Sequence, residues 1–327
     1  MSDVILEVKG LKRYFPIKSG FLGGRTGVAK VLDGISFHVN RRETLGIVGE
    51  SGSGKTVLLR TILRLIEPTG GSILFEGQDL ATMGGEQLRH VRREMQIIFQ
   101  DPVGSLHPRM TIEQTLMEPF IIHGVGDKAE REERVRQLLS LVGLNPDWRK
   151  RYPHQFSGGQ RQRIGVARAL ALQPKLILAD EPVSALDVSL QAQVLNLIQD
   201  LQEEFQLTYV FVAHDLAVLR QICDRIAIMY LGKIVELAPA DAIYENPLHP
   251  CTKSLLAASP SIQAGLVENG AARVIARGDV PDPAHPPGGC PFHPRCPMAF
   301  DPCPTEVPPL IEAENGHWVS CHLVTPP

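Results

Sequence analysis

Hydrophobic residues along this chain fall into two kinds of segment, which alternate. One kind is a short apolar or alternating run typical of β-strands, and such runs occupy residues 4–8, 31–39, 44–48, 71–77, 95–100, 175–180, 208–213 and 226–238. The other kind has apolar residues at helical spacing, in residues 57–66, 130–150, 157–172 and 189–205. This alternation of strand-like and helix-like segments predicts an α/β fold.

The turn after residues 44–48 reads Gly-Glu-Ser-Gly-Ser-Gly-Lys-Thr and leads into a helix-like segment. A glycine-rich turn between a strand and a helix can bind phosphate, because its N–H groups point inward and the helix N-terminus is partly positive. We therefore predict a nucleotide-binding loop, with Lys55 on the β- and γ-phosphates and Thr56 on Mg²⁺. The loop residues assigned to the nucleotide are Gly49, Ser51, Gly52, Ser53, Gly54, Lys55 and Thr56. The alternative is a turn without a ligand, which the complete motif and its flanks disfavour.

Three further strand-like segments end in polar residues, at the edge of the sheet where α/β proteins bind ligands. Asp180 offers the hard oxygen ligands that Mg²⁺ prefers, and Glu181 is placed to take a proton from a water that attacks the γ-phosphate. Gln100 and His214 end two other strands, and we expect His214 to hydrogen-bond the γ-phosphate. The alternatives are surface carboxylates that cap a helix and a structural histidine.

Residues 157–160, Ser-Gly-Gly-Gln, open one of the predicted helices. Ser157 is a suitable N-cap, while Gly158 and Gly159 expose N–H groups at the positive end of the helix, which makes a second potential anion site. Ser-Gly-Gly is also an ordinary turn, so both interpretations stay open on these residues alone. Asp187 closes a tight turn before a later helix.

Tyr14 and Phe15 come shortly before residues 18–30, a stretch rich in glycine and basic residues that we expect to be an exposed loop. An aromatic ring at this place could stack on adenine, or it could belong to the hydrophobic core. The spacing alone does not separate the two interpretations.

The composition is that of a globular protein: 43% of the 327 residues are hydrophobic, enough for one large domain or two modest ones. The net charge of -3 gives no reason to expect nucleic acid as a partner. The N-terminus lacks the layout of a signal peptide, and no apolar run reaches the roughly 18 residues of a membrane helix. We therefore expect a cytoplasmic protein whose contact with a membrane goes through a partner.

Four of the six cysteines fall in the last 38 residues: Cys290, Cys296, Cys303 and Cys321. Clustered cysteines in a cytosolic chain indicate a metal before disulfides, and four thiolates can hold a [4Fe–4S] cluster or a tetrahedral Zn²⁺. The gaps between them are wider than those usual for structural zinc, and three of the four precede proline. A metal-free tail is the third interpretation.

Over residues 4–260 these motifs occur in the order and spacing of one family, and the chain resembles the ATP-binding subunit of an ATP-binding-cassette (ABC) transporter. Residues 49–56 match the Walker A motif, Gln100 the Q-loop, residues 157–160 the signature motif, Asp180 and Glu181 the Walker B acid and catalytic base, Asp187 the end of the D-loop, His214 the switch histidine, and Tyr14 (or else Phe15) the aromatic residue that stacks on adenine.

This resemblance implies an α/β fold with a P-loop core, an antiparallel β subdomain and a helical subdomain in residues 1–260, followed by a small irregular cysteine-rich tail in residues 261–327. It implies an active ATPase in which Glu181, His214 and Gln100 are catalytic. Mg²⁺ is then held by Thr56, Gln100 and Asp180. Because two subunits of this family pack head to tail, each nucleotide also meets Ser157, Gly158, Gly159, Gln160 and Asp187.

Further stretches resemble the oligopeptide/dipeptide importer branch of the family, namely residues 11–18, 99–102, 106–110 and 246–253. The branch implies a homologous but non-identical second ATP-binding subunit, two transmembrane permease subunits and an extracytoplasmic solute-binding protein. It implies a peripheral location on the cytoplasmic face of the inner membrane, and it favours a [4Fe–4S] cluster over Zn²⁺ in the tail.

Other functions stay open at this point. The same branch contains importers of glutathione, nickel complexes and sugars. A soluble cassette ATPase that acts on ribosomes or DNA is disfavoured, since such members carry two cassettes or long coiled coils. A metal or redox sensor is supported by the cysteine tail alone.

Overall fold

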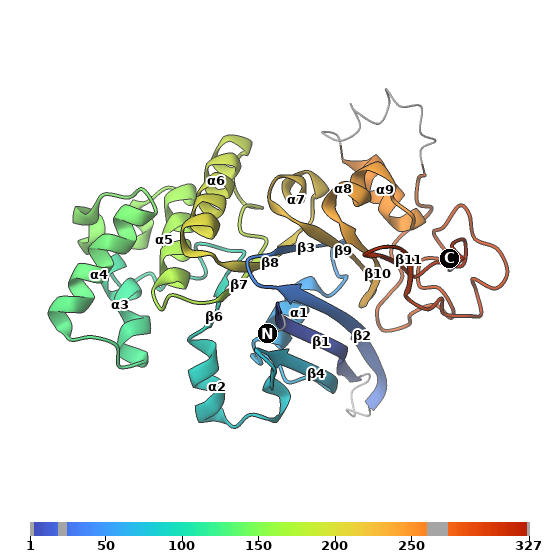
Figure 1. Cartoon of the computed structure of the whole chain (residues 1–327), viewed down its shortest axis with the longest axis horizontal. Coiled ribbons are helices and arrows are strands. Elements are labelled where there is room, and N and C mark those ends of the chain that lie inside the picture. Colours follow the sequence, from blue (N-terminus) through green and yellow to red (C-terminus); the bar gives the residue numbers. More distant parts are fainter. Residues whose placement is uncertain (1–2, 19–24, 260–273, 326–327) are drawn as a thin grey trace. The chain divides into compact units, whose positions relative to one another are not determined.

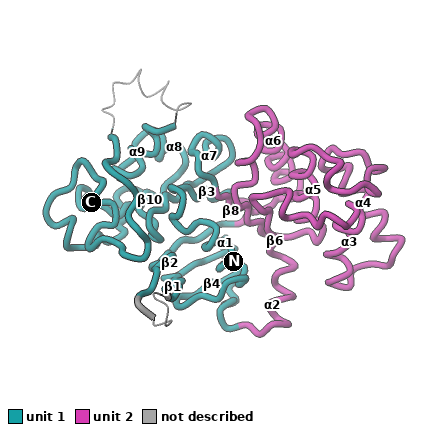
Figure 2. The backbone as a smooth tube through the Cα atoms, turned by 180° about the vertical axis from the view of Figure 1, so that it is seen from behind, with its two compact units in different colours: residues 1–40, 44–82, 213–327 teal, residues 41–43, 83–212 magenta. Residues whose placement is uncertain are grey.

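The computed structural model describes residues 3–18, 25–259 and 274–325. The chain forms two compact units, coloured separately in Figure 2. Unit 1 contains residues 1–40, 44–82 and 213–327, and unit 2 contains residues 41–43 and 83–212. The predicted division near residue 260 stays a prediction, because residues 260–273 lie outside the described part of the chain.

Unit 1 contains an antiparallel sheet with the strand order β2-β1-β4-β5 (Figure 1). Its strands are β1 Val4–Lys18, β2 Arg25–Asn40, β4 Gly70–Phe75 and β5 Gln78–Asp79, followed by the 3-10 turn Leu80–Thr82. This sheet is the antiparallel β part of the predicted fold. The prediction of an exposed loop over residues 18–30 is wrong at both ends, because β1 and β2 go on pairing as far as Lys18 opposite Arg25.

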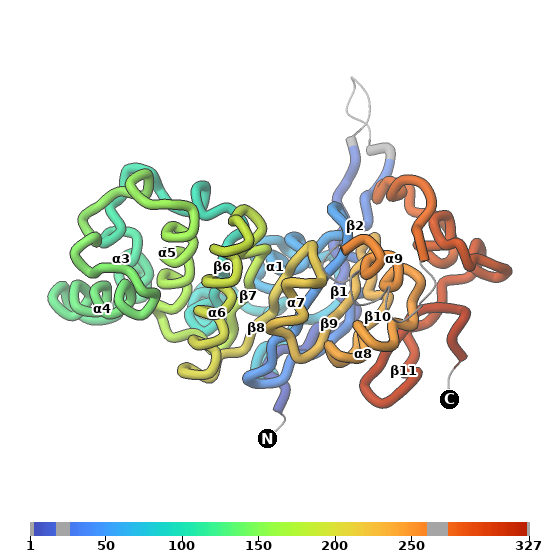
Figure 3. The backbone as a smooth tube through the Cα atoms, turned by 90° about the horizontal axis from the view of Figure 1, so that it is seen from above, coloured from blue at the N-terminus to red at the C-terminus, as the bar shows by residue number. Residues whose placement is uncertain are grey.

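The strands that unit 1 contributes to the second sheet have the order β11-β12-β10-β9-β3. The buried strand β3 Thr44–Val48 pairs in parallel with β9 Arg225–Tyr230, and β9 forms the predicted hairpin with β10 Lys233–Pro239. The turn of this hairpin is tight, since Leu231 and Gly232 both have positive φ, 43° and 74°. The helices of the unit are α1 Lys55–Ile62, α7 Leu216–Ile222, α8 Ala240–Glu245 and α9 Pro250–Ala258, and α8 and α9 lie beside β10 (Figure 3).

The C-terminal segment joins this second sheet. Between residues 274 and 310 it forms only turns and bends, as expected of an irregular tail. Beyond them, β11 Ile311–Glu314 and β12 His317–Val319 form a hairpin, and β12 pairs with β10 through Val319 and Glu236. The expectation of a wholly irregular tail is therefore wrong for this hairpin.

Unit 2 has three parallel strands, which pair in the order β8-β7-β6, and a group of helices. The strands are β6 Met95–Ile98, β7 Leu176–Asp180 and β8 Thr208–Ala213, which ends at the unit boundary. The helices are α2 Gly85–Arg92, α3 Ile112–Ile122, α4 Lys128–Leu141, α5 Gly158–Leu170 and α6 Val188–Phe205, with 3-10 turns at Pro146–Lys150 and Pro153–Gln155. Helices α3, α4 and α5 pack on one another, as Figure 3 shows, and form the predicted helical part.

The helix predicted over residues 130–150 is too long. Helix α4 ends at Leu141, and Gly143 follows with a φ of 71° that favours glycine and stops the helix. Pro146 then begins a separate 3-10 turn. Among the described residues, no helix is both long and apolar enough to cross a membrane.

Candidate functional site

The glycine-rich loop connects β3 to α1 and folds around the side chain of Lys55. The Lys55 ammonium is buried and donates hydrogen bonds to the carbonyl oxygens of Gly49, at 2.7 Å, and Glu50, at 3.2 Å. The N–H of Ser53 donates to the same Glu50 carbonyl at 3.1 Å. The loop is therefore a closed turn with the cation at its centre.

Two glycines are sterically required in this loop. A Cβ on Gly49 would lie 2.0 Å from the carbonyl oxygen of Met229. Gly54 has a φ of 103°, and a Cβ there would lie 2.6 Å from the carbonyl oxygen of Val31. Neither position accepts another residue without movement of the backbone, since both obstructing atoms are main-chain atoms.

The start of α1 is suited to an anion. Its N-cap Gly54 provides no side-chain hydrogen bond, and no acidic residue lies in its first turn. The hydroxyl of Ser53 is buried and has no hydrogen-bond partner among the described residues. Buried polar groups without partners are rare, and the free N–H groups of a helix start attract negative charge. The loop therefore fits the phosphates of a nucleotide, as the sequence predicts.

Tyr14 lies on β1, half-buried, and is held by its hydroxyl group. The hydroxyl donates a 2.5 Å hydrogen bond to Asp33, and Lys233 forms an ion pair with the same carboxylate at 3.0 Å. The hydrogen bond to Asp33 raises the pKa of Tyr14 to about 12. The Phe15 ring instead packs against the Arg13 guanidinium, whose central carbon lies 4.4 Å from the ring centroid. A fixed, partly exposed ring is compatible with adenine stacking at Tyr14, which stays a prediction.

In unit 2, the structure brings Gln100 and Glu181 together. The Gln100 amide nitrogen donates to a Glu181 carboxylate oxygen at 3.1 Å. Asp180 is buried at the end of β7, and Glu181 follows it with a φ of 44°, unusual for a residue with a side chain. The N–H of Glu181 donates to the Val212 carbonyl at 3.0 Å, so the backbone is fixed where the carboxylate leaves the strand.

Ser157 and Asp187 both act as helix N-caps. The Ser157 hydroxyl accepts from the N–H of Gln160, whose side chain accepts in return from the N–H of Ser157, which confirms the predicted cap of α5. The Asp187 carboxylate accepts a hydrogen bond from the Leu190 N–H at 2.9 Å and thereby caps α6. This hydrogen bond lowers the pKa of the Asp187 carboxyl group. The start of α5 packs against α6, because Leu190 lies in contact range of Gly159.

His214 directly follows β8, belongs to unit 1 and is exposed. The next residue, Asp215, caps α7 through the N–H of Ala217 and accepts a 3.1 Å hydrogen bond from Ser259. The position of His214 after a strand agrees with the sequence expectation, and its contact with phosphate stays a prediction.

Comparisons with known proteins agree with this geometry. Residues 32–184 match the family model described as ABC transporter, and residues 235–303 match the model described as oligopeptide/dipeptide transporter, C-terminal region. The oligopeptide transport ATP-binding protein AppF of Bacillus subtilis is 52% identical over 98% of both chains. The chain belongs to the ATP-binding subunits of ABC transporters.

Two further likenesses support this membership. The di/tripeptide transport ATP-binding protein DppF of Pseudomonas aeruginosa is 46% identical over 98% of both chains. An ATP-binding cassette solved as a dimer in a post-hydrolysis state with ADP and Pi is 28% identical, with a TM-score of 0.64 over 72% of this chain and 98% of the other. The protein is thus the ATP-hydrolysing subunit of an ABC importer, in the oligopeptide/dipeptide branch.

The matched ranges of this ABC subunit cover most of its motifs. The first contains the loop at residues 49–56, Gln100, the signature residues 157–160 and both Walker B carboxylates. The second contains Cys290, Cys296 and Cys303 and ends before Cys321. Tyr14 and His214 lie outside both ranges.

The four tail cysteines of the subunit are free thiols. Burial raises the pKa of Cys321 to about 11, and Cys290, Cys296 and Cys303 act in the same direction. In the described ranges, however, no three or more histidine, cysteine, aspartate or glutamate side chains are grouped to hold a metal ion. The predicted [4Fe–4S] or Zn²⁺ site is not supported by this arrangement.

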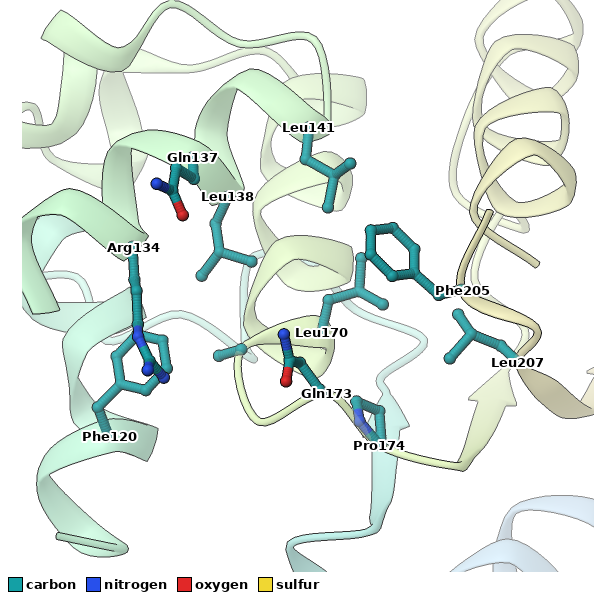
Figure 4. Close-up of a pocket in the computed structure, with 11 residues that line it drawn as sticks. Phe120, Arg134, Gln137, Leu138, Leu141, Leu170, Gln173, Pro174, Phe205 and Leu207 are labelled. Carbon is teal, nitrogen blue, oxygen red and sulfur yellow. The ribbon is translucent and has the colours of Figure 1, made fainter. Parts of the chain in front are cut away.

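Unit 2 of the subunit also contains a cavity of about 500 Å³ (Figure 4). Its walls come from α3, α4, α5, the end of α6 and the residues next to β7 and β8, and Arg134 lies beside the Phe120 ring, 5.6 Å from its centroid. No residue assigned to the nucleotide or to Mg²⁺ lines it. The cavity is therefore separate from the predicted catalytic residues of the unit.

The sequence interpretation missed one partner of the nucleotide loop. Arg295, in the cysteine-rich tail, forms an ion pair with Glu50 at 2.6 Å. Glu50 occupies a variable position of the Walker A motif, and 245 residues separate the two side chains, so no local pattern could have indicated the contact.

Proposed function

We propose that this subunit hydrolyses ATP to drive the import of peptides. The observation that carries the proposal is the match of residues 235–303 to the C-terminal region of oligopeptide/dipeptide transporters. Relatives named for oligopeptide and for di/tripeptide transport add support. Glutathione, nickel complexes and sugars are the competing solutes, since they are carried by the same branch.

We assign each motif residue a task in hydrolysis, and Gln100 has two. The loop N–H groups and Lys55 bind the phosphates, and Tyr14 stacks on adenine. Thr56, Asp180 and Gln100 hold Mg²⁺, which when bound neutralises phosphate charge. Glu181 takes the proton of the attacking water, oriented by Gln100, while His214 hydrogen-bonds the γ-phosphate. The Gln100–Glu181 hydrogen bond supports this division of roles.

The proposed motor is a head-to-tail dimer with a homologous, non-identical ATP-binding subunit. The start of α5 is exposed at Ser157, where it can meet a nucleotide bound to the partner, and Asp187 starts the neighbouring helix. ATP then bridges two surfaces that share no other ligand, and hydrolysis removes the bridge. Closure acts on two permease subunits from the cytoplasmic face of the membrane, and an extracytoplasmic binding protein delivers the solute.

The tail cysteines are the proposed ligands of a [4Fe–4S] cluster, with Zn²⁺ as the alternative. Four thiols are the right donors, and Cys290, Cys296 and Cys303 each precede a proline that fixes the backbone. The described arrangement is not itself a ligand set, so no step of hydrolysis is assigned to a metal. Anaerobic purification followed by iron, sulfide and zinc analysis tests the cluster. Iron and sulfide in equal amounts with absorbance at about 400 nm support it, and stoichiometric zinc refutes it.

Uptake by cells tests the proposed solute. A strain that lacks this subunit should lose uptake of labelled di- and oligopeptides and should regain it with the wild-type chain but not with Glu181→Gln. Uptake of labelled glutathione, nickel and sugars should be unchanged in the same strain. Normal peptide uptake together with loss of one of the other solutes would reassign the substrate.

A further inference from the structure

The cysteine-rich tail reaches the nucleotide loop through one ion pair. The Arg295 guanidinium donates to the Glu50 carboxylate at 2.6 Å, and the side chains are only 11% and 27% exposed. Charge-assisted hydrogen bonds of this length that are largely shielded from water are stronger than pairs on the open surface. The Arg295–Glu50 ion pair therefore stabilises the contact between the tail and the loop more than an exposed surface ion pair would.

Arg295 has further contacts on the side away from Glu50. Its guanidinium carbon lies 6.0 Å from the ring centroids of both Tyr230 and Phe292, and its Nε–H donates to the Gly278 carbonyl at 3.3 Å. Phe292 is buried and meets Tyr230 edge to face at 5.2 Å. The guanidinium is thus fixed by groups of the tail and of β9 before it contacts Glu50.

Glu50 in turn determines the shape of the loop. Its carbonyl oxygen accepts the hydrogen bonds of the Ser53 N–H and the Lys55 ammonium, so rotation of this peptide would break the turn. The preceding Gly49 is wedged against the Met229 carbonyl, one residue before Tyr230. Glu50 is therefore held twice: its carbonyl oxygen by hydrogen bonds within the loop and its side chain by Arg295 of the tail.

We infer that Arg295 is a positioning residue for ATP binding, which keeps the nucleotide loop in its phosphate-binding shape through Glu50. The inference rests on the proposed role of residues 49–56. A loop held in the bound shape loses little conformational freedom when it binds, so its affinity is higher than that of a loose loop. The tail of this subunit accordingly contributes to ATP affinity without contact with ATP.

Equilibrium binding of a fluorescent ATP analogue to the full-length chain with Mg²⁺ tests the inference. Arg295→Ala should weaken binding by about fivefold to tenfold, at the low end of usual couplings between sites, and Arg295→Lys should restore part of the loss. In steady-state hydrolysis the KM for ATP should rise by a similar factor while kcat changes less than about twofold. A variant that is merely less folded would lower kcat and leave KM unchanged.

Two controls make the outcome specific. Arg277→Ala removes an exposed arginine of the same tail, whose described hydrogen bond is only that of its backbone, and should bind like wild type. Glu50→Gln should weaken binding as Arg295→Ala does, and the double variant should be no weaker than either single one. Wild-type affinity of Arg295→Ala, or additive losses in the double variant, would overturn the inference. Undiminished binding by Lys55→Ala would instead refute the proposed loop itself.

Discussion

Gln100 and Glu181 are joined by a 3.1 Å hydrogen bond between the side-chain amide and the carboxylate. One residue follows β6 and the other follows β7, and these strands pair in parallel, so the sheet itself brings the two ends together. The hydrogen bond from the amide limits the rotation of the carboxylate. Glu181 is thereby oriented as a base by a neighbour that carries no charge of its own.

Loss of this orientation should slow the chemical step. Gln100→Ala is expected to lower kcat by about tenfold to a hundredfold, because a misplaced base takes the proton of the attacking water poorly, with a smaller change in KM for ATP. Gln96→Ala is the matched control, since it removes a glutamine amide on the neighbouring strand β6 whose described hydrogen bond goes to the Arg92 carbonyl. Equal kcat values for Gln100→Ala and wild type would show that Gln100 does not orient Glu181.

Lys55→Ala should abolish tight nucleotide binding. The substitution removes the cation at the centre of the loop and leaves the carbonyls of Gly49 and Glu50 facing the phosphates. We expect a loss of affinity of about tenfold to a hundredfold, which corresponds to a charge-assisted contact of about 1.5–3 kcal/mol. Titration with a labelled ATP analogue measures it, and retained affinity would show that the loop does not bind phosphate.

Ser157→Asp separates stability from catalysis. Aspartate caps helices as well as serine, so the melting temperature should not change. A carboxylate at the proposed contact with the partner's nucleotide should lower ATP hydrolysis by about tenfold or more through repulsion of the phosphates. Thr111→Asp, at the N-cap of α3 in the same unit, should leave hydrolysis unchanged. Wild-type activity of Ser157→Asp would contradict the signature assignment.

His249 should make stability depend on pH. Burial lowers the pKa of this histidine from 6.5 to about 4, so the unfolded chain binds the extra proton at a higher pH than the folded one. The stabilising effect is complete above pH 6.5 and is lost as the pH falls towards 4, by on the order of 3 kcal/mol. His249→Asn keeps a cap for α9, whose Cys251 N–H bonds to His249 at 2.9 Å. The free energy of unfolding, measured with denaturant between pH 7 and pH 4.5, should fall less steeply with falling pH in the variant than in wild type. An equal pH dependence in both would contradict the lowered pKa of His249.

The local motifs could be predicted because short stretches of sequence determine them. The turn at Gly49 is set by the strand before it and the helix after it, and Ser157 and Gln160 form their capping box within four residues. The Glu50–Arg295 pair could not be predicted, because it depends on how the tail folds against β9. The pairing of β12 with β10 could not be predicted for the same reason, because short strands find their pairing partners only in the tertiary structure.

Local breaks in the helical part were misjudged for a different reason. The apolar spacing of α4 suggested a continuous helix, yet Gly143 and Pro146 end it and start a new turn. The extension of β1 and β2 likewise depends on pairing across the hairpin rather than on hydrophobicity. In both cases backbone geometry overrode the pattern of side chains.

The central claim is that this chain hydrolyses ATP with Glu181 as the base, and Glu181→Gln tests it most directly. ATP-analogue binding and steady-state hydrolysis are measured on the same full-length preparations of wild type and variant. We predict unchanged affinity for the analogue together with a loss of about a hundredfold to ten-thousandfold in kcat, the usual contribution of a general base. Hydrolysis by the variant at close to the wild-type rate would contradict the claim.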